Sequence, residues 1–272
     1  MSRLFMIAGM VLLGVVGLSG ASAASDYQEI VVSDGGTITG KIILKGPIPP
    51  PRIFPLAFYP FAPYCAKNQK ITDGKGNVVV NDVSAGPDGG LGNVVVMVKG
   101  VERGKQFKPI VADLVARGCE FLPFVSIVQN HGKFTMKNED PVLHNAQLYQ
   151  AEKGNVILNV PIPPNSFETH EIRLEKNMKV SKMICGMHEF MQMWEVAVDN
   201  PYYALTGSDG KFSIDGLPPG KYEVIAWRPH FKPIEQEITV SAKQTASLDF
   251  EFDSNQVIRP EYEHQEKFRM TP

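Results

Sequence analysis

The sequence predicts an all-β protein built from two β-sandwich domains. Gly and Pro are frequent, with 24 and 21 residues, which favours turns and short strands over long helices. From about Phe121, short runs of alternating apolar and polar residues follow one another at regular intervals. After Asn200 a second series begins, and it contains Asp209-Gly210, a strong hairpin signal between two strand-like runs. Only 110–118, "IVADLVARG", resembles a helix.

Composition limits the classes of function. Of the 272 residues, 43% are hydrophobic and 21% are charged, so the chain is able to bury a core. The formal net charge of -2 gives no overall field that would attract nucleic acid or anionic lipid. We therefore expect no nucleic-acid partner.

The first residues, 1–24, are expected to form a secretory signal peptide. Arg3 is followed by an apolar run from Leu4 to Leu18 and by the small residues Ala21-Ser22-Ala23, which is the pattern that signal peptidase cleaves. The apolar run is short for a membrane span, although an uncleaved anchor is the alternative. Cleavage near Ala23 or Ala24 predicts a periplasmic or secreted protein that does not span the membrane.

The strands are expected in the following order. Residues 36–44, "GTITGKIIL", alternate like a half-buried strand. The proline-rich passage 47–63 is expected to be an extended surface loop. Strands 77–80 and 93–98 follow, on either side of a glycine-rich loop. The later strands are expected at 123–130, 133–138, 142–149, 155–160, 168–174, 179–185 and 195–199.

The C-terminal part resembles the carboxypeptidase regulatory-like domain, a transthyretin-like β-sandwich. The similar residues are Thr206 to Ile214, the turn "LPPG" at 217–220, Tyr222 and the closing strands 235–240 and 245–252. The family opens with a "GxVxG" strand and a "NVVV"-type strand, and here such strands lie far upstream, at 36–44 and 93–98.

The resemblance therefore implies a domain that is split in the sequence. It would comprise 25–108 and 200–253, with a second domain inserted at 109–199, and the tail 254–272 would be loosely ordered. A plain tandem arrangement, in which one sandwich follows the other, is the alternative.

Three cysteines remain, Cys65, Cys119 and Cys185. An odd number in an exported protein leaves one cysteine unpaired or with another role. The simplest interpretation pairs Cys65 with Cys119 and leaves Cys185 for chemistry, although spacing alone does not prove that pairing.

Residues 183–194, "MICGMHEFMQMW", carry a candidate metal site. A type 1 copper site needs one thiolate, two imidazole nitrogens and a weak axial thioether. Cys185 and His188 supply two of these ligands from one turn. Met191, three residues beyond His188, is the preferred axial ligand. Met193 is the alternative, and it ranks second because Gln192-Met193-Trp194 is expected to begin the next strand.

The stretch 134–149 together with 183–194 resembles the cupredoxins. Those proteins carry a His-Asn pair on one strand, preceded by an Asn in a strand-ending turn, and here these residues are His144, Asn145 and Asn138. The resemblance implies a Greek-key sandwich that binds one type 1 copper ion through His144, Cys185, His188 and Met191. Asn145 and Asn138 would hold the ligands in place through hydrogen bonds.

Zinc is the rival metal, since one thiolate and two imidazoles bind it as well. The thioether favours copper, because zinc rarely takes one. Glu189 departs from many relatives, which have proline after the histidine ligand. The remaining histidines are expected at the surface; they are His131, His170, His230 and His264.

These observations predict an exported blue-copper electron carrier rather than an enzyme, because four protein ligands leave no open position for substrate. His188 is expected to reach the surface with its ring edge. Met187 and Phe190 would form an apolar patch around it for docking a redox protein such as a c-type cytochrome. The alternatives are a protein- or glycan-binding module built on the transthyretin-like domain, with a structural copper domain, and a copper carrier.

Overall fold

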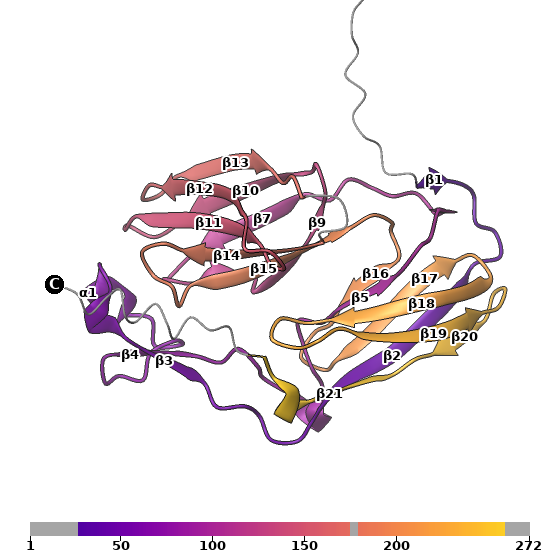
Figure 1. Cartoon of the computed structure of the whole chain (residues 1–272), viewed down its shortest axis with the longest axis horizontal. Helices are drawn as coiled ribbons and strands as arrows, with labels where there is room; N and C mark the ends of the chain where they lie inside the picture. The colour runs from indigo at the N-terminus through magenta and orange to yellow at the C-terminus, as the bar shows by residue number, and fades with distance from the viewer. Residues whose placement is uncertain (1–26, 175–178, 259–272) are drawn as a thin grey trace, which may run out of the picture.

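The computed structural model describes residues 27–174 and 179–258. They form two β-sandwiches with only short helical turns between strands (Figure 1). The predicted signal peptide and residues 259–272 of the predicted tail lie outside the described residues, whereas Ser254–Gln256 form the short 3-10 helix η3. None of the helices in the described part has the length and apolar character to span a membrane.

The first sandwich consists of strands β7 to β15, which form two sheets. One sheet has the order β13-β10-β7-β8 and the other β12-β11-β14-β15-β9. Its strands are β7 (Ala112–Ala116), β8 (Phe121–Leu122), β9 (Val125–Gln129), β10 (Lys133–Asn138), β11 (His144–Gln150), β12 (Val156–Ile162), β13 (Phe167–Glu171), β14 (Val180–Cys185) and β15 (Gln192–Val198).

The second sandwich combines strands from the two ends of the described chain. One sheet has the order β16-β5-β18-β19 and the other β17-β2-β20, with β21 also pairing with β2. Its strands are β2 (Gly36–Lys45), β5 (Val95–Val98), β16 (Tyr203–Leu205), β17 (Lys211–Leu217), β18 (Gly220–Trp227), β19 (Ile234–Val240), β20 (Thr245–Ser247) and β21 (Phe250–Asp253). The two short strands β1 (Gln28–Glu29) and β6 (Arg103–Gly104) pair separately.

The helix expected at 110–118 is wrong, because this segment forms strand β7. Ala112, Leu114 and Ala116 are buried while the residues between them are less buried, which is the two-residue period of a strand. β7 pairs in parallel with β10, so that Leu114 lies opposite Met136. Pairing with a neighbouring strand thus overrides the helical propensity of Ala and Leu.

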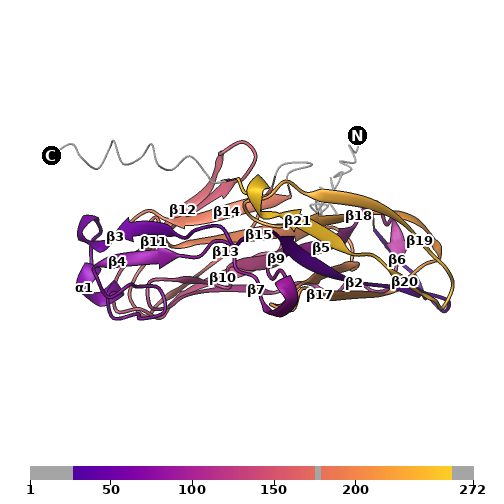
Figure 2. The same ribbon diagram turned by 90° about the horizontal axis from the view of Figure 1, so that it is seen from below.

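Residues 52–80, which we call the cap, cover one end of the first sandwich (Figures 1 and 2). They contain β3 (Arg52–Pro55), η1 (Leu56–Phe58), α1 (Ala62–Cys65) and β4 (Asn77–Val80), and β3 pairs with β4. The expectation of an exposed loop at 47–63 is therefore wrong for this part. Its apolar side chains belong to the core of the first sandwich; they are Phe54, Leu56, Tyr59, Cys65 and Val78.

We propose that the second sandwich is the domain split in the sequence, because β2 and β5 share sheets and a core with strands that begin at Tyr203. One boundary differs from the expected division. The cap lies within 25–108, yet its apolar side chains join the core of the first sandwich. The first sandwich therefore draws on more of the chain than 109–199.

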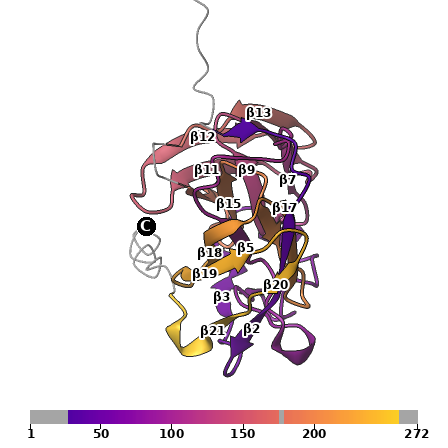
Figure 3. The same ribbon diagram turned by 90° about the vertical axis from the view of Figure 1, so that its right-hand side faces the viewer.

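The two sandwiches pack against each other through a small apolar cluster; Figure 3 views the molecule from the end of the second sandwich. Val95 of β5 meets Val125 of β9 and Val196 of β15 in a small apolar cluster. Trp194 and Trp227, one from each sandwich, lie with ring centroids 6.0 Å apart. The second sandwich thus packs on the outer face of the five-stranded sheet of the first sandwich.

A buried ion-pair network joins the cap to both sandwiches, with Asp82 at its centre. Arg52 donates from Nε and Nη2 to the Asp82 carboxylate at 2.5 and 2.6 Å, and also to Gln192 of β15 at 3.3 Å. Arg228 donates to the Asp82 carbonyl oxygen at 2.9 Å, and His230 Nε2 lies 3.5 Å from the carboxylate. Burial opposes ionisation, but the bonds from His230 and Arg52 hold the pKa of Asp82 below its usual range.

His230 was expected at the surface, and this expectation is wrong because the residue is buried. Its ring lies 5.7 Å from the ring of Trp194. Burial lowers the pKa of His230 despite the nearby Asp82 carboxylate. The sequence offered no sign of this, since the partners of His230 come from distant parts of the chain.

Replacing Asp82 should destabilise the whole molecule. Asp82→Ala would leave the largely buried Arg52 guanidinium without its carboxylate, and breaking a buried pair costs about 3–5 kcal/mol. Denaturant unfolding monitored by tryptophan fluorescence would measure it. Glu251→Ala, which breaks the exposed pair with Lys45, is the matched control and should change the free energy of unfolding little. Equal midpoints for the two variants would contradict a central role for Asp82.

Candidate metal centre

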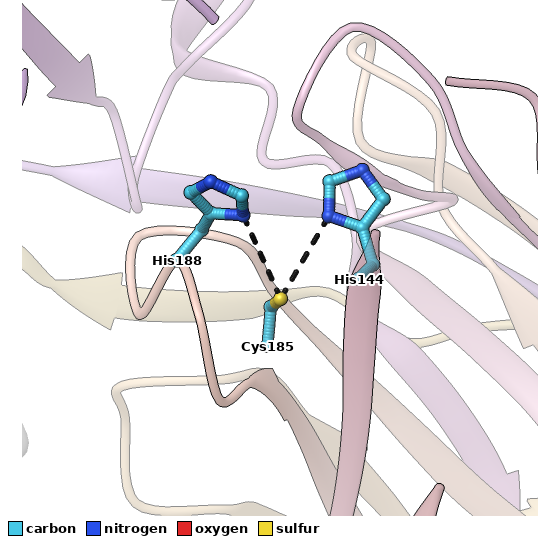
Figure 4. Close-up of side chains that lie close together, drawn as sticks. All are labelled: His144, Cys185 and His188. Atoms are coloured by element: carbon cyan, nitrogen blue, oxygen red, sulfur yellow. Dashed lines mark hydrogen bonds between the residues drawn. The ribbon is translucent and has the colours of Figure 1, made fainter. Parts of the chain in front are cut away.

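Three buried side chains of the first sandwich converge at the end nearest the cap (Figure 4). His144 is the first residue of β11, Cys185 is the last residue of β14, and His188 lies in the loop that follows. β11 and β14 are antiparallel neighbours, so the start of one lies beside the end of the other. The structure thus brings together residues that are 41 positions apart in the sequence.

The distances within this group match those expected around a single ion. Nδ1 of His144 and Nδ1 of His188 each lie 3.8 Å from the Cys185 sulfur, and the three ligand atoms lie within 4.8 Å of one another. Metal–sulfur and metal–nitrogen bonds of about 2.3 and about 2.0 Å, set at the angle of a trigonal plane, separate the two atoms by about 3.7 Å. The donor set and its spacing therefore fit a metal ion held by one thiolate and two imidazoles.

Both imidazoles are fixed by a partner at the second ring nitrogen. His188 Nε2 lies 2.8 Å from the carbonyl oxygen of Pro60. A carbonyl oxygen only accepts hydrogen bonds, so Nε2 carries the proton and Nδ1 keeps its lone pair for a metal. His144 Nε2 lies 2.8 Å from a carboxylate oxygen of Asp140, which imposes the same tautomer. Such partners orient histidine ligands and raise their basicity.

Asp140 is the functional residue that sequence reasoning missed. It accepts hydrogen bonds from the backbone N–H groups of Gly118 and Cys119 at 2.5 and 2.9 Å, and from the Tyr64 hydroxyl at 2.9 Å. Burial opposes ionisation, but the bonds from His144 and from these N–H groups lower the pKa of Asp140 to about 2. The only signal in the sequence is an aspartate four residues before the histidine.

Electrostatics favour the thiolate even without a metal. Burial raises the pKa of Cys185, but the contacts with His144 and His188 and the hydrogen bond from the Asn145 N–H outweigh burial and lower the pKa to about 6. Burial lowers the pKa of His144, but the bonds to Asp140 and Cys185 raise it to about 9. The thiolate is the form of cysteine that binds metals.

The two predicted supporting asparagines are placed as follows. Asn138 donates to the carbonyl oxygens of Val142 and Ile162 at 2.8 and 2.9 Å and accepts from the Asp140 N–H at 2.9 Å, which fixes the loop before His144. The Asn145 N–H points to the Cys185 sulfur at 3.4 Å. Its carbonyl oxygen accepts from the Gly186 N–H at 2.9 Å.

The loop 186–191 is held by its own backbone. Cys185 N–H donates to the Met191 carbonyl at 3.1 Å, Met191 N–H to the His188 carbonyl at 2.8 Å, and His188 N–H to the Cys185 carbonyl at 3.2 Å. Gly186 allows the close approach of β11, because a Cβ there would lie 2.5 Å from Asn145 Oδ1. The ligand loop is thus a closed turn of fixed shape.

Met191 and Met193 are both buried. Met193 lies within β15 opposite Met183, whereas Met191 precedes the strand in the closed ligand loop. Met191 therefore shares the loop of Cys185 and His188, whereas Met193 belongs to the following strand.

Two expectations about the surface of the site are wrong. His188 is fully buried rather than exposed at its ring edge, and Phe190 is buried as well. The cap causes both, since Pro60 accepts the hydrogen bond of His188, and the Phe190 ring lies 5.0 Å from Tyr59 and 6.1 Å from Phe54. Met187 remains half-buried.

The cap is anchored beside the site by a disulfide. Cys65 of α1 and Cys119, which precedes β8, are joined, and Cys185 is the free cysteine. The Cys65 sulfur lies 3.8 Å from His188 Nε2. The disulfide therefore fixes the part of the cap that contacts the second histidine.

Comparison with known proteins gives one family match and several structural likenesses. Residues 194–253 match the family model of the carboxypeptidase regulatory-like domain, which covers the strands β16 to β21 and begins within β15. No curated protein matches the chain.

Similar solved structures include several cupredoxins. A purple cupredoxin from Nitrosopumilus maritimus is 20% identical with a TM-score of 0.28 and covers 32% of this chain and 99% of its own. Auracyanin from Roseiflexus castenholzii is 12% identical with a TM-score of 0.28, covering 32% and 96%. Amicyanin from Paracoccus versutus is 11% identical with a TM-score of 0.28, covering 38% and 97%. At these scores the likenesses add nothing to what the strands and side chains show.

Removing the Asp140 carboxylate should weaken metal binding. In Asp140→Asn one carboxylate oxygen becomes an NH2 group, which would face the N–H of either Gly118 or Cys119, so the side chain would shift and His144 would lose its fixed orientation. Losing such a partner lowers metal affinity by about 10- to 100-fold, which competition with a chromophoric copper chelator would measure. Asp113→Asn, on an exposed position of β7, is the control. Equal affinities in the two variants would show that Asp140 does not support the site.

Proposed function

We propose that this protein is a type 1 copper protein that carries single electrons between redox partners in the periplasm or outside the cell. The observation that supports it most is the arrangement of His144, Cys185 and His188, with both Nδ1 atoms 3.8 Å from the sulfur. Two imidazoles and one thiolate near a trigonal plane are the ligands of blue-copper electron-transfer sites. Met191 is the proposed axial ligand and Met193 the alternative.

A bound copper ion would supply a one-electron redox couple, Cu(II)/Cu(I). The chain's own residues provide rigidity. Asp140 and the Pro60 carbonyl oxygen keep a proton on Nε2 of each histidine, so neither imidazole needs to gain or lose one. The closed ligand loop and the buried surroundings hold the donor atoms in place and exclude water, which keeps rearrangement small when the charge of the site changes.

Two observations argue for electron transfer over metal delivery. His188 is fully buried, and the cap that covers it is joined to the sandwich by the disulfide between Cys65 and Cys119. A carrier that hands its metal to another protein needs ligands that an acceptor is able to reach. The second sandwich contributes packing to β9 and β15, which suits a supporting role.

Cysteine replacement tests the proposal directly. Cys185→Ser should abolish the intense visible absorption of the copper-loaded protein, because that absorption arises from charge transfer between thiolate sulfur and Cu(II). A visible spectrum with and without reductant measures it. Ser181→Ala, elsewhere on β14, is the control and should keep the colour. Persistence of the absorption in Cys185→Ser would refute the assignment.

The two methionines are distinguished by their effect on the reduction potential. Met191→Leu should raise it, since a thioether that donates to the metal stabilises the oxidised state and the axial ligand tunes the potential. Met193→Leu conserves volume within β15 and should leave the potential near the wild-type value. Protein-film voltammetry would compare them. A shift confined to Met193→Leu would make Met193 the axial ligand.

A further inference from the structure

The cap separates the His188 imidazole from solvent and provides its hydrogen-bonded connection to the surface. The Nε2–H of His188 donates to the carbonyl oxygen of Pro60 at 2.8 Å. Pro60 itself is exposed, and the next residue is Phe61. Only one peptide unit therefore lies between the imidazole and a solvent-facing side chain.

Two phenylalanines stand on the outer side of the cap. Phe58 is 60% exposed and Phe61 is 42% exposed, and the Phe61 ring centroid lies 6.3 Å from that of His188. Phe61 has φ of 57°, a backbone conformation that is unfavourable for a bulky residue. Its carbonyl oxygen accepts from the N–H groups of Tyr64 and Cys65 at 2.9 and 3.2 Å, so the start of α1 holds this placement.

A cleft adjoins the same surface. Its volume is about 840 Å³, and its lining includes Phe58 and Pro60 of the cap, Met187 and Glu189 of the ligand loop, and residues of β11 and β14. Met187 was expected to contact a partner, and here it shares a cleft with the exposed cap. Cys185 also lines this cleft, so a side chain of a docked protein inserted there would lie close to the site.

The cap is basic although the chain as a whole is slightly acidic. Lys67, Lys70 and Lys75 are exposed, against one aspartate, Asp73, while Arg52 is neutralised by Asp82. Tyr64 lies one turn of helix beyond Phe61. The Nζ atom of Lys67 lies over the Tyr64 ring, 6.0 Å from its centroid. Apolar side chains flanked by lysines fit a partner that carries acidic groups around an apolar edge.

We propose that the cap is the docking surface of this site, and that its partner is a one-electron redox protein with acidic side chains around the exposed edge of its cofactor. This inference rests on the proposed function. Phe58 and Phe61 contact the partner, and the lysines attract it. Electrons then pass along the hydrogen bond between His188 and Pro60: the partner's cofactor loses one electron and the copper gains it. Nε2 keeps its proton throughout, so no proton transfer accompanies the step.

The surface can be mapped on the metal-free protein. Paramagnetic hexacyanochromate(III), a redox-inert trianion, should broaden amide resonances of 58–70 in an NMR titration. Lys67→Glu combined with Lys70→Glu should abolish the broadening, while Lys243→Glu, on the β19–β20 turn of the second sandwich, should not. Broadening centred elsewhere, or unchanged in the double variant, would overturn the proposal.

Electron transfer is then measured on the copper-loaded protein by stopped-flow oxidation of the reduced form. With anionic hexacyanoferrate(III) at low salt, the double lysine variant should react about tenfold more slowly, and added salt should reduce the difference. With cationic tris(phenanthroline)cobalt(III), the same variant should react faster than the wild type. A change of the same sign with both oxidants would indicate structural damage and would overturn the charge argument.

The apolar contact is tested with a matched pair of phenylalanines. Phe61→Ala should slow oxidation by tris(phenanthroline)cobalt(III), whose aromatic ligands require an apolar contact, without changing the visible spectrum. Phe167→Ala, at an exposed position of β13, should leave the rate unchanged. Equal rates in both variants would overturn the docking role of Phe61 while leaving the copper assignment intact. If the wild-type protein lacked thiolate-to-copper absorption, the proposed function itself would fail.

Discussion

The carboxylate of Asp140 is the constraint on which the geometry of the site depends. It is buried, it is ionised, and its hydrogen bonds come from three separate parts of the chain: His144, the backbone at Gly118 and Cys119, and Tyr64 of the cap. A buried charge is stable only when its hydrogen bonds are satisfied, so these groups hold one another in position. The orientation of one ligand and the attachment of the cap are thus set by the same side chain.

The cap changes what this site presents to its surroundings. In the first sandwich alone, the loop carrying His188 would face solvent, because it connects two strands at the end of a sheet. The pairing of β3 with β4 closes the cap on itself, and the disulfide and the Asp82 network hold residues 52–80 against the core. The site is consequently rigid and dry, and its contact with other molecules is moved outward to the residues on the cap.

The sequence was sufficient for the parts of the structure that depend on local pattern. Alternating runs predicted most strands of the first sandwich, and the residue types of His144, Cys185 and His188 indicated a thiolate–imidazole site. Long-range packing was not predictable in the same way. The helical composition of 110–118 was overridden by pairing with β10. The burial of His188 and Phe190 depends on a proline-rich segment more than a hundred residues away, and His230 is buried beside Asp82 and Trp194. Asp140 was missed because nothing in its local sequence distinguishes a buried acceptor from a solvated carboxylate.

The position of His188 between two sulfur groups has a chemical consequence. Its Nδ1 lies 3.8 Å from the Cys185 sulfur, and its Nε2 lies 3.8 Å from the Cys65 sulfur. A thiolate with a pKa of about 6 is a competent nucleophile toward a disulfide, and attack on Cys65 would scramble the bridge and consume the metal-binding sulfur. The imidazole contacts both sulfurs, one at each ring nitrogen, and occupies space through which the thiolate would have to pass. The ring proposed to offer a nitrogen to the ion is therefore also the group that packs next to the reduced cysteine and next to the oxidised pair.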